Sequence, residues 1–307
     1  MTSTIRFFTA DVFTSEMFGG NQLAVFPSAG GLDTRLMQAI ARELNLSETV
    51  FVFPPADSAR TRKLRIFTPG TELPFAGHPT LGAAFVLASI GEVMLDGANT
   101  SIVFEEGVGA IPVTIRAEGG RPIYCELTAA RLPEFGPLPP PVDEIAAVLS
   151  LRPDEIRRDD FSPRAASCGV PFFFIPLRDE AALARARPDL SVWERSFSGW
   201  WAPHLYPFVE TAGRQGVDIR GRMFAPEMGI AEDPATGAAA AALAGYLAAT
   251  RPPGNGTLRW IVDQGIEMGR PSRLHLECDR KGERITAVRV GGSAVMVAEG
   301  SLAVPPK

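Results

Sequence analysis

One pattern occurs twice in this chain, about half a chain apart. Residues 65–84 read RIFTPGTELPFAGHPTLGAA, and residues 222–239 read RMFAPEMGIAEDPATGAA. Both segments begin with Arg, an apolar residue, Phe, a small residue and Pro, which a short loop follows. Both end in His or Asp, then Pro, two further residues and Gly-Ala-Ala. Two copies of one unit predict a pseudo-symmetric protein, with His78 and Asp233 in matching places before helices.

The composition is that of a globular protein with room for two domains. The chain has 307 residues, of which 46% are hydrophobic and 21% charged, and this excludes an intrinsically disordered chain. A net charge of −5 with no basic stripe argues against nucleic-acid binding. No apolar run reaches the length of a membrane span, and the N-terminus lacks a signal-peptide pattern, so we expect a cytoplasmic protein.

Two segments predict helices that are buried on every side. Residues 80–90 and 236–249 are apolar nearly all round, and a helix without a polar face must be surrounded by other elements. Short β-branched and aromatic segments supply strands to surround them. The predicted fold class is therefore α+β (mixed α/β), with two pseudo-symmetric lobes, each a mixed, largely antiparallel sheet wrapped around a central helix.

A proline-rich stretch sets the expected domain boundary. Residues 132–141 read LPEFGPLPPP, which is typical of a semi-rigid linker. We therefore expect an N-terminal lobe over 1–130 and a C-terminal lobe over 131–307, opened by a helix over 142–151. The sequence leaves open whether the last strands cross back to the N-terminal lobe.

The repeated motif places one ionisable side chain at the start of each buried helix. Because proline is favoured at the first helical position, His78 and Asp233 are both predicted as N-caps. A helix N-terminus favours a neutral imidazole and binds anions, so backbone N–H groups near Gly82 and Gly237 could hold a substrate carboxylate. The alternative for both residues is a capping role alone.

Glu48 is a third candidate, at a loop-to-strand junction in NLSETV. A carboxylate in a closed apolar cleft can exchange protons near neutral pH. Composition alone favours a solvated surface position for it. The turn cluster QGIEMGRPS at residues 264–272 is either a plain loop or, through Gly265, part of a site.

Several other classes of site are excluded by residue spacing. His204 and His275 lack carboxylate or cysteine neighbours at ligand spacing, so no metal site is expected. The three widely separated cysteines form neither a disulfide framework nor a zinc pattern. Dinucleotide-binding, P-loop and Gly-x-Ser-x-Gly motifs are absent from the sequence.

At these motifs the chain resembles the phenazine-biosynthesis (PhzF-like) isomerase family, which has the diaminopimelate epimerase-like fold. The matching segments, in order, are DVFTSEMFGGNQLAVF, LNLSETVFV, RIFTPGTELPFAGHPTLGAAFVL, EDPATGAAAAALAGYL and QGIEMGRPS. The resemblance implies a cofactor-free isomerase, usually a homodimer, with its active site between the lobes. It acts on a small carboxylated substrate, such as a dihydro-hydroxyanthranilate-like compound.

The resemblance also assigns roles to residues. It implies that Glu48 of Ser-Glu-Thr is the catalytic acid/base. His78 and Asp233 are implied as substrate-binding or proton-relay residues. The further residues expected to line the site are Asn21, Ser47, Gly77, Gly237, Ala238 and Gly265.

Two departures from the family pattern bear on the substrate. Members usually read Gly-Asn-Pro where this chain has Gln22, and a serine where it has Ala238. The missing hydroxyl removes one hydrogen bond, worth about 1 kcal/mol, and so leaves the substrate open. An epimerase, another isomerase of the same fold, or a non-catalytic binding protein remain alternatives. Two-thiol racemisation is excluded, because His78 and Asp233 stand where related racemases carry cysteines.

Overall fold

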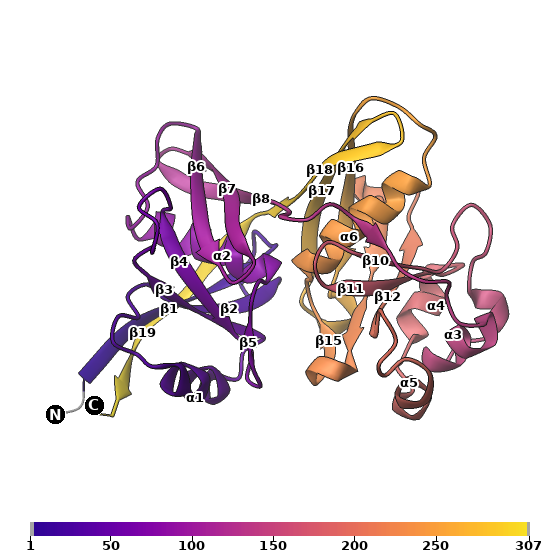
Figure 1. Ribbon diagram of the computed structural model, residues 1–307, viewed down its shortest axis with the longest axis horizontal. Helices are drawn as coiled ribbons and strands as arrows, with labels where there is room; N and C mark the ends of the chain where they lie inside the picture. The colour runs from indigo at the N-terminus through magenta and orange to yellow at the C-terminus, as the bar shows by residue number, and fades with distance from the viewer. Residues whose placement is uncertain (1–2, 306–307) are drawn as a thin grey trace. The chain divides into compact units, whose positions relative to one another are not determined.

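The computed structural model describes residues 3–305, and the chain divides into two compact units (Figure 1). The first unit comprises the chain up to Ala130 together with the segment from Gly291 onward, and the second comprises Arg131–Val290. The C-terminal strand therefore belongs to the N-terminal unit. Among the described residues, no helix is both long and apolar enough to cross a membrane.

The first unit is built on a mixed sheet. Its strands are β1 (Ser3–Val12), β2 (Asn21–Phe26), β3 (Glu48–Phe53), β4 (Arg62–Phe67), β5 (Glu72–Leu73), β6 (Asn99–Glu106), β7 (Gly109–Glu118), β8 (Arg121–Thr128) and β19 (Ala294–Val304). Strands β2 and β3 pair in parallel, as do β4 and β6, and the other pairs are antiparallel. Each parallel connection contains a helix, because a parallel pair cannot be joined by a tight turn.

The second unit is built in the same way. Its strands are β9 (Glu134–Phe135), β10 (Arg164–Ser167), β11 (Pro171–Pro176), β12 (His204–Glu210), β13 (Ile219–Gly221), β14 (Met223–Ala225), β15 (Ile230–Asp233), β16 (Gly256–Gln264), β17 (Ser272–Lys281) and β18 (Arg284–Gly292). Here β11 pairs in parallel with β12, and β13 with β16.

The order of pairing repeats from one unit to the other. From β19 through β1, β2, β3, β4, β6 and β7, neighbours pair antiparallel, antiparallel, parallel, antiparallel, parallel and antiparallel. From β9 through β10, β11, β12, β13, β16 and β17, the succession is the same. The duplication predicted from the sequence motif is thus present in the backbone.

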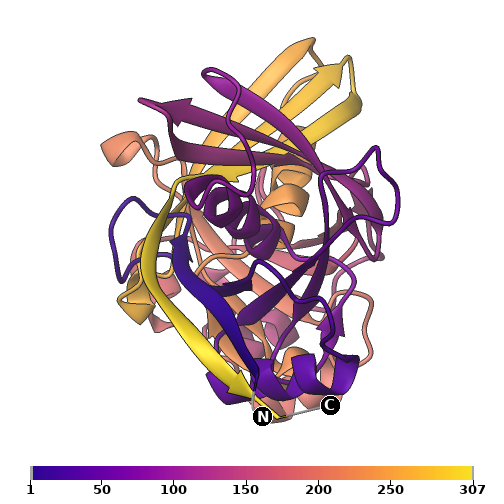
Figure 2. The same ribbon diagram turned by 90° about the vertical axis from the view of Figure 1, so that its left-hand side faces the viewer.

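Each unit contains one helix that is buried all round. In α2 (Gly77–Ser89) every residue from Gly77 to Ala88 is buried, and in α6 (Gly237–Ala249) only Ala238 and the last residue are not. Figure 2 shows α2 enclosed by the strands of the first unit. Gly82 permits the close packing, because a Cβ there would lie 2.4 Å from Leu23 Cδ2. The predicted buried helices and the mixed α/β class are confirmed.

The remaining helices lie nearer the surface. Helix α1 (Thr34–Leu44) begins after Asp33, whose carboxylate accepts a hydrogen bond from Leu36 N, and it is capped at its C-terminal end by the left-handed Asn45. The second unit adds α3 (Val142–Val148), α4 (Glu180–Arg185) and α5 (Leu190–Ser196). The predicted linker over 132–141 is partly wrong, because Glu134 and Phe135 form β9 and pair with β10.

Candidate active site

Three of the expected site residues meet at the start of three elements of the first unit. Asn21 opens β2, Glu48 opens β3, and His78 is in the first turn of α2. His78 Nε2 lies 3.2 Å from Glu48 Oε2, and His78 Nδ1 lies 3.2 Å from Asn21 Nδ2. Glu48 is 8% exposed and His78 3%, so the composition-based expectation of a surface glutamate is wrong. Ser47 is the residue directly before Glu48, and Gly77 is the residue directly before His78.

Burial controls the charge of the His78 ring. Loss of solvation lowers its pKa from 6.5 to about 3, and a hydrogen bond with the backbone of Gln22 opposes this only in part. The ring is therefore neutral at physiological pH. A neutral imidazole carries one N–H and one free lone pair, so the ring beside Glu48 can both donate and accept a proton.

His78 is not the N-cap that the sequence predicts. Helix α2 begins at Gly77 with Ala76 as its cap, so His78 lies one position inside the helix. The reason is that the Ala76 carbonyl accepts both the backbone N–H and the hydroxyl of Thr80, at 3.2 and 2.8 Å. Gly82 is too far along α2 for its N–H to be one of the free donors of the first turn, contrary to expectation.

Asp233 is not an N-cap either, because it lies before the start of its helix rather than inside it. It ends β15, and α6 begins only at Gly237 with Thr236 as its cap. Its carbonyl accepts a hydrogen bond from Gln264 Nε2 at 2.8 Å, which takes the place of the first bond of a longer helix. Its carboxylate accepts the Thr236 hydroxyl at 2.5 Å. The predicted N-cap role of Asp233 is therefore wrong.

The other expected residues of the second unit lie close to Asp233. Gly265 packs against Pro234, the residue after Asp233, because a Cβ at position 265 would lie 2.6 Å from Pro234 O. The φ of +76° at Gly265 also favours glycine. Gly237 opens α6, so its N–H lacks a helical acceptor, and Ala238 follows it, half-buried. Tyr206, whose hydroxyl bonds Gln264 Oε1 at 3.1 Å, completes this cluster.

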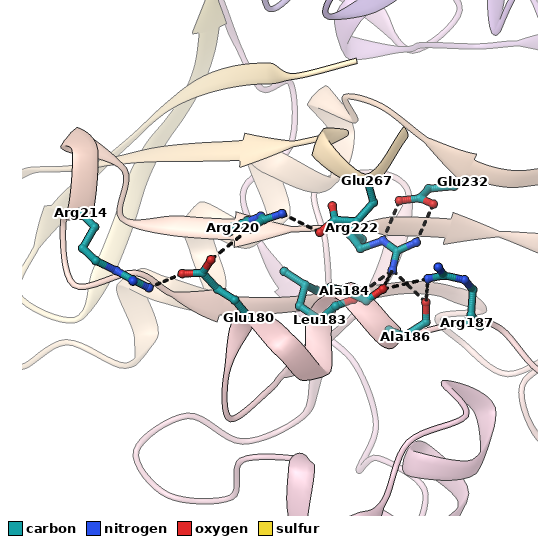
Figure 3. A network of polar contacts seen from close by, with 10 residues as sticks. All are labelled: Glu180, Leu183, Ala184, Ala186, Arg187, Arg214, Arg220, Arg222, Glu232 and Glu267. Carbon is teal, nitrogen blue, oxygen red and sulfur yellow. Dashed lines mark hydrogen bonds and ion pairs between the residues drawn. The ribbon is translucent and has the colours of Figure 1, made fainter. Parts of the chain in front are cut away.

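Two arginines anchor the segments that carry Asp233 and Gly265 (Figure 3). Arg222 forms two bonds of 2.8 Å to Glu232, the neighbour of Asp233, and also donates to carbonyls at the end of α4. Arg220 joins Glu180 of α4 to Glu267 in the Gly265 turn, at 2.9 and 2.7 Å. These contacts hold β15 and the turn against α4.

Strand register identifies the position in the second unit that corresponds to Glu48. A weaker upstream repeat, GNQLAVFP at residues 20–27 and GVPFFFIP at residues 169–176, aligns Leu23 with Phe172. Leu23 of β2 is opposite Glu48, as Phe172 of β11 is opposite His204. The next residues, Thr49 and Leu205, are opposite the matching phenylalanines of the two motifs, Phe67 and Phe224. Both registers place His204 where the first unit has Glu48.

Several residues of these clusters carry no signal in the sequence. Gln264, Thr236 and Tyr206 hold Asp233, and Glu106 contacts α2. Thr236 and Gln264 belong to motifs that the sequence singles out, whereas Tyr206 and Glu106 do not. His204 has no carboxylate or cysteine neighbours at ligand spacing in the sequence, so no sequence pattern marks it as a site residue. Its correspondence to Glu48 becomes visible only when the strand register is combined with the sequence repeat.

Within residues 3–305, no group of three His, Cys, Asp or Glu side chains is arranged to hold a metal ion.

Comparison with known proteins gives the family. The model of the phenazine biosynthesis-like protein family (PhzC-PhzF) matches residues 10–300. An uncharacterized isomerase of Mesorhizobium japonicum is 41% identical, covering 97% of this chain and 99% of the relative. The trans-2,3-dihydro-3-hydroxyanthranilate isomerase of Pseudomonas aeruginosa is 36% identical, covering 96% and 98% of the two chains.

Solved structures agree at the level of the fold. A PhzF-family protein of Bacillus anthracis matches with a TM-score of 0.88 at 24% identity, over 98% of this chain and 100% of the other. A predicted epimerase of Pseudomonas aeruginosa matches with a TM-score of 0.79 at 32% identity, over 97% and 99%. On these matches the chain belongs to the phenazine biosynthesis-like (PhzF) family and is an isomerase.

Proposed function

We propose that this isomerase moves a proton between two carbons of a small carboxylated substrate, such as a dihydro-hydroxyanthranilate-like compound. The observation that carries the proposal is the buried Glu48–His78 contact, with 3.2 Å between Oε2 and Nε2. Glu48 takes the proton from one carbon, the electron pair of the broken C–H bond shifts into the conjugated system, and Glu48 returns the proton to another carbon. Such general acid/base chemistry needs no cofactor.

The other residues bind and orient the substrate. Neutral His78, held by Asn21, keeps the Glu48 carboxyl group in place and relays its proton. In the second unit, Asp233, Ala238 and Gly265 are proposed as substrate-binding positions, with the Gly237 N–H offered to a carboxylate. Ser47 and Gly77 complete the set beside Glu48 and His78. The trans-2,3-dihydro-3-hydroxyanthranilate isomerases among the relatives favour this substrate class.

The first test is Glu48→Gln, assayed with trans-2,3-dihydro-3-hydroxyanthranilate. Because the amide keeps the shape but cannot accept a proton, turnover is expected to fall about 10²–10⁴-fold with folding unchanged. Glu43→Gln, an exposed position on α1, is the matched control and should behave as the parent protein. Unchanged turnover in a folded Glu48→Gln protein would remove Glu48 from the mechanism.

Solvent-deuterium exchange separates this reaction from the alternatives. A proton shift between carbons yields a product with its double bond moved, and it carries deuterium at the receiving carbon where Glu48 exchanges with solvent before returning the proton, whereas an epimerase places deuterium at the carbon that lost a proton. A binding protein incorporates none. NMR of candidate acids incubated with the protein in D₂O reads all three outcomes directly.

A homodimer, which the family resemblance implies, and a cytoplasmic location, which the sequence pattern predicts, remain predictions. Sedimentation equilibrium of the purified protein decides the first, with a mass of twice the 32.9 kDa chain expected. Fractionation of cells that produce the full chain decides the second.

A further inference from the structure

A second buried carboxyl group lies beside the first turn of α2. Glu106, the last residue of β6, is 6% exposed, and its Oε1 lies 2.7 Å from the hydroxyl of Thr80. That hydroxyl also lies 2.8 Å from the Ala76 carbonyl, the cap of α2. Thr80 is two residues after His78, so this cluster and the Glu48–His78 pair share one helical turn.

Counting protons defines the state of Glu106. The Thr80 hydroxyl has one hydrogen, yet two acceptor oxygens lie within bonding distance of it. Both contacts are hydrogen bonds only when Glu106 supplies the second proton, so that Thr80 donates to Ala76 O and accepts from Glu106. If Glu106 is ionised, the hydroxyl turns to the carboxylate and the Ala76 carbonyl loses that bond.

The surroundings of Glu106 favour the protonated form. On β4, the neighbouring strand, Arg62, Lys63 and Arg65 are each bound to another glutamate, Glu92, Glu105 and Glu72. On β7 the residue opposite is Gly109, and on α2 the one ionisable side chain is neutral His78. Among residues 3–305, Glu106 Oε2 has no hydrogen-bond partner, so ionisation would leave this oxygen unsolvated.

We infer that Glu106, through its protonated carboxyl group and Thr80, is a positioning residue that holds the first turn of α2 and with it His78. The inference rests on the proposed role of His78. Ionisation of Glu106 loosens the turn without touching the substrate. The pKa of Glu106 is raised to about 8, because burial disfavours the charged form and outweighs the opposing hydrogen bond from Thr80.

The expected consequence is an alkaline limit set by a residue outside the reacting groups. Turnover should decline above pH 8, by about tenfold per pH unit once Glu106 is mostly ionised. Glu106→Gln keeps the volume, donates an N–H to Thr80 and cannot ionise, so this decline should disappear. Glu105→Gln is the matched control, because Glu105 is the preceding residue, bound to Lys63 at the surface, and its variant should keep the decline.

Two spectroscopic measurements decide the inference without any turnover. Infrared difference spectra at pH 7 should show the carbonyl band of a protonated carboxyl group in the parent protein and in Glu105→Gln, but not in Glu106→Gln. In ¹⁵N NMR of the three imidazoles, the His78 signal should shift as the pH passes 8 in the parent and stay constant in Glu106→Gln. Signals are assigned with His204→Gln and His275→Gln.

Opposite results overturn the inference. A Glu106 carboxylate already ionised at pH 7, or an unchanged alkaline shift of His78 in Glu106→Gln, shows that Glu106 does not hold the turn through its proton. These readouts remain valid if Glu48→Gln keeps full turnover, so failure of the proposed function is distinguishable from failure of this inference. Thr80→Val, which lacks the hydroxyl, should show the shifted His78 signal at every pH.

Discussion

At the scale of single residues, burial sets the charge of three groups. His78 and His204 are kept neutral because an imidazolium would lose its solvation, and their pKa values fall to about 3 and about 4. Burial raises the pKa of Glu106 to about 8 for the same reason. The two histidines contribute stability above pH 6.5 that is lost as the pH falls through their folded pKa values. The contribution of Glu106 is full below pH 4.5 and is lost as the pH rises towards 8.

The effect of burial on the charge of a histidine can be measured at His204, which belongs to the second unit. Its pKa is lowered from 6.5 to about 4, so the parent protein should lose up to about 3 kcal/mol of unfolding free energy at this site between pH 6.5 and 4. In His204→Gln this part of the loss should vanish. Urea unfolding at both pH values is the measurement, with His275→Gln, on β17 and half-buried, as the control. Equal acid losses in the parent and His204→Gln would contradict the burial argument.

At the scale of elements, the end of β15 is held by side chains rather than by helix formation. Arg222 is 2% exposed and joins Glu232 to the carbonyls that end α4, and Gln264 takes the carbonyl of Asp233. A buried arginine satisfied on both sides ties β15 and α4 into one piece. Asp233 is thereby kept extended where the matching segment of the first unit is helical.

Removing the charge of Arg222 should therefore be costly. Arg222→Met removes the buried guanidinium to which Glu232 and the carbonyls at the end of α4 are bound, and about 3–5 kcal/mol of unfolding free energy should be lost. The matched control is Arg273→Met, which breaks a similar two-bond pair with Asp263 at the surface and should cost under about 1 kcal/mol. Equal losses in the two variants, measured by urea unfolding, would show that Arg222 is not a structural anchor.

At the scale of the whole molecule, the duplicated order of pairing explains the path of the C-terminal strand. In the second unit, β10 has β9 as its outer neighbour, and in the first unit the same place beside β1 is filled by β19. The pairing runs from Ser3 opposite Val304 to Val12 opposite Ala294, with one bulge after Thr9. The last segment of the chain thus completes the unit in which the chain begins.

Removal of residues 291–307 tests this arrangement. Strand β2 pairs with β1 only over Phe8–Val12, so residues 3–7 would lose the strand partner that β19 supplies, and their amides should exchange with a free energy of opening near zero. The second unit keeps all its strands except the end of β18, so β11 and α6 should keep their protection from hydrogen exchange and serve as the internal control. Unchanged protection of β1 after truncation would contradict a stabilising role for β19.

Periodicity and short motifs are local properties, and the sequence alone was therefore enough to predict the duplication, the two all-apolar helices and the candidates Glu48, His78 and Asp233. Only the tertiary structure decided where α2 and α6 begin, that Glu48 is buried against His78, that His204 occupies the place of Glu48, and that Glu106 contacts α2. Those features depend on groups far apart in the chain, such as Asn21 and His78, 57 positions apart. Burial and hydrogen-bond competition between such groups set charge and helix ends, and no local pattern records them.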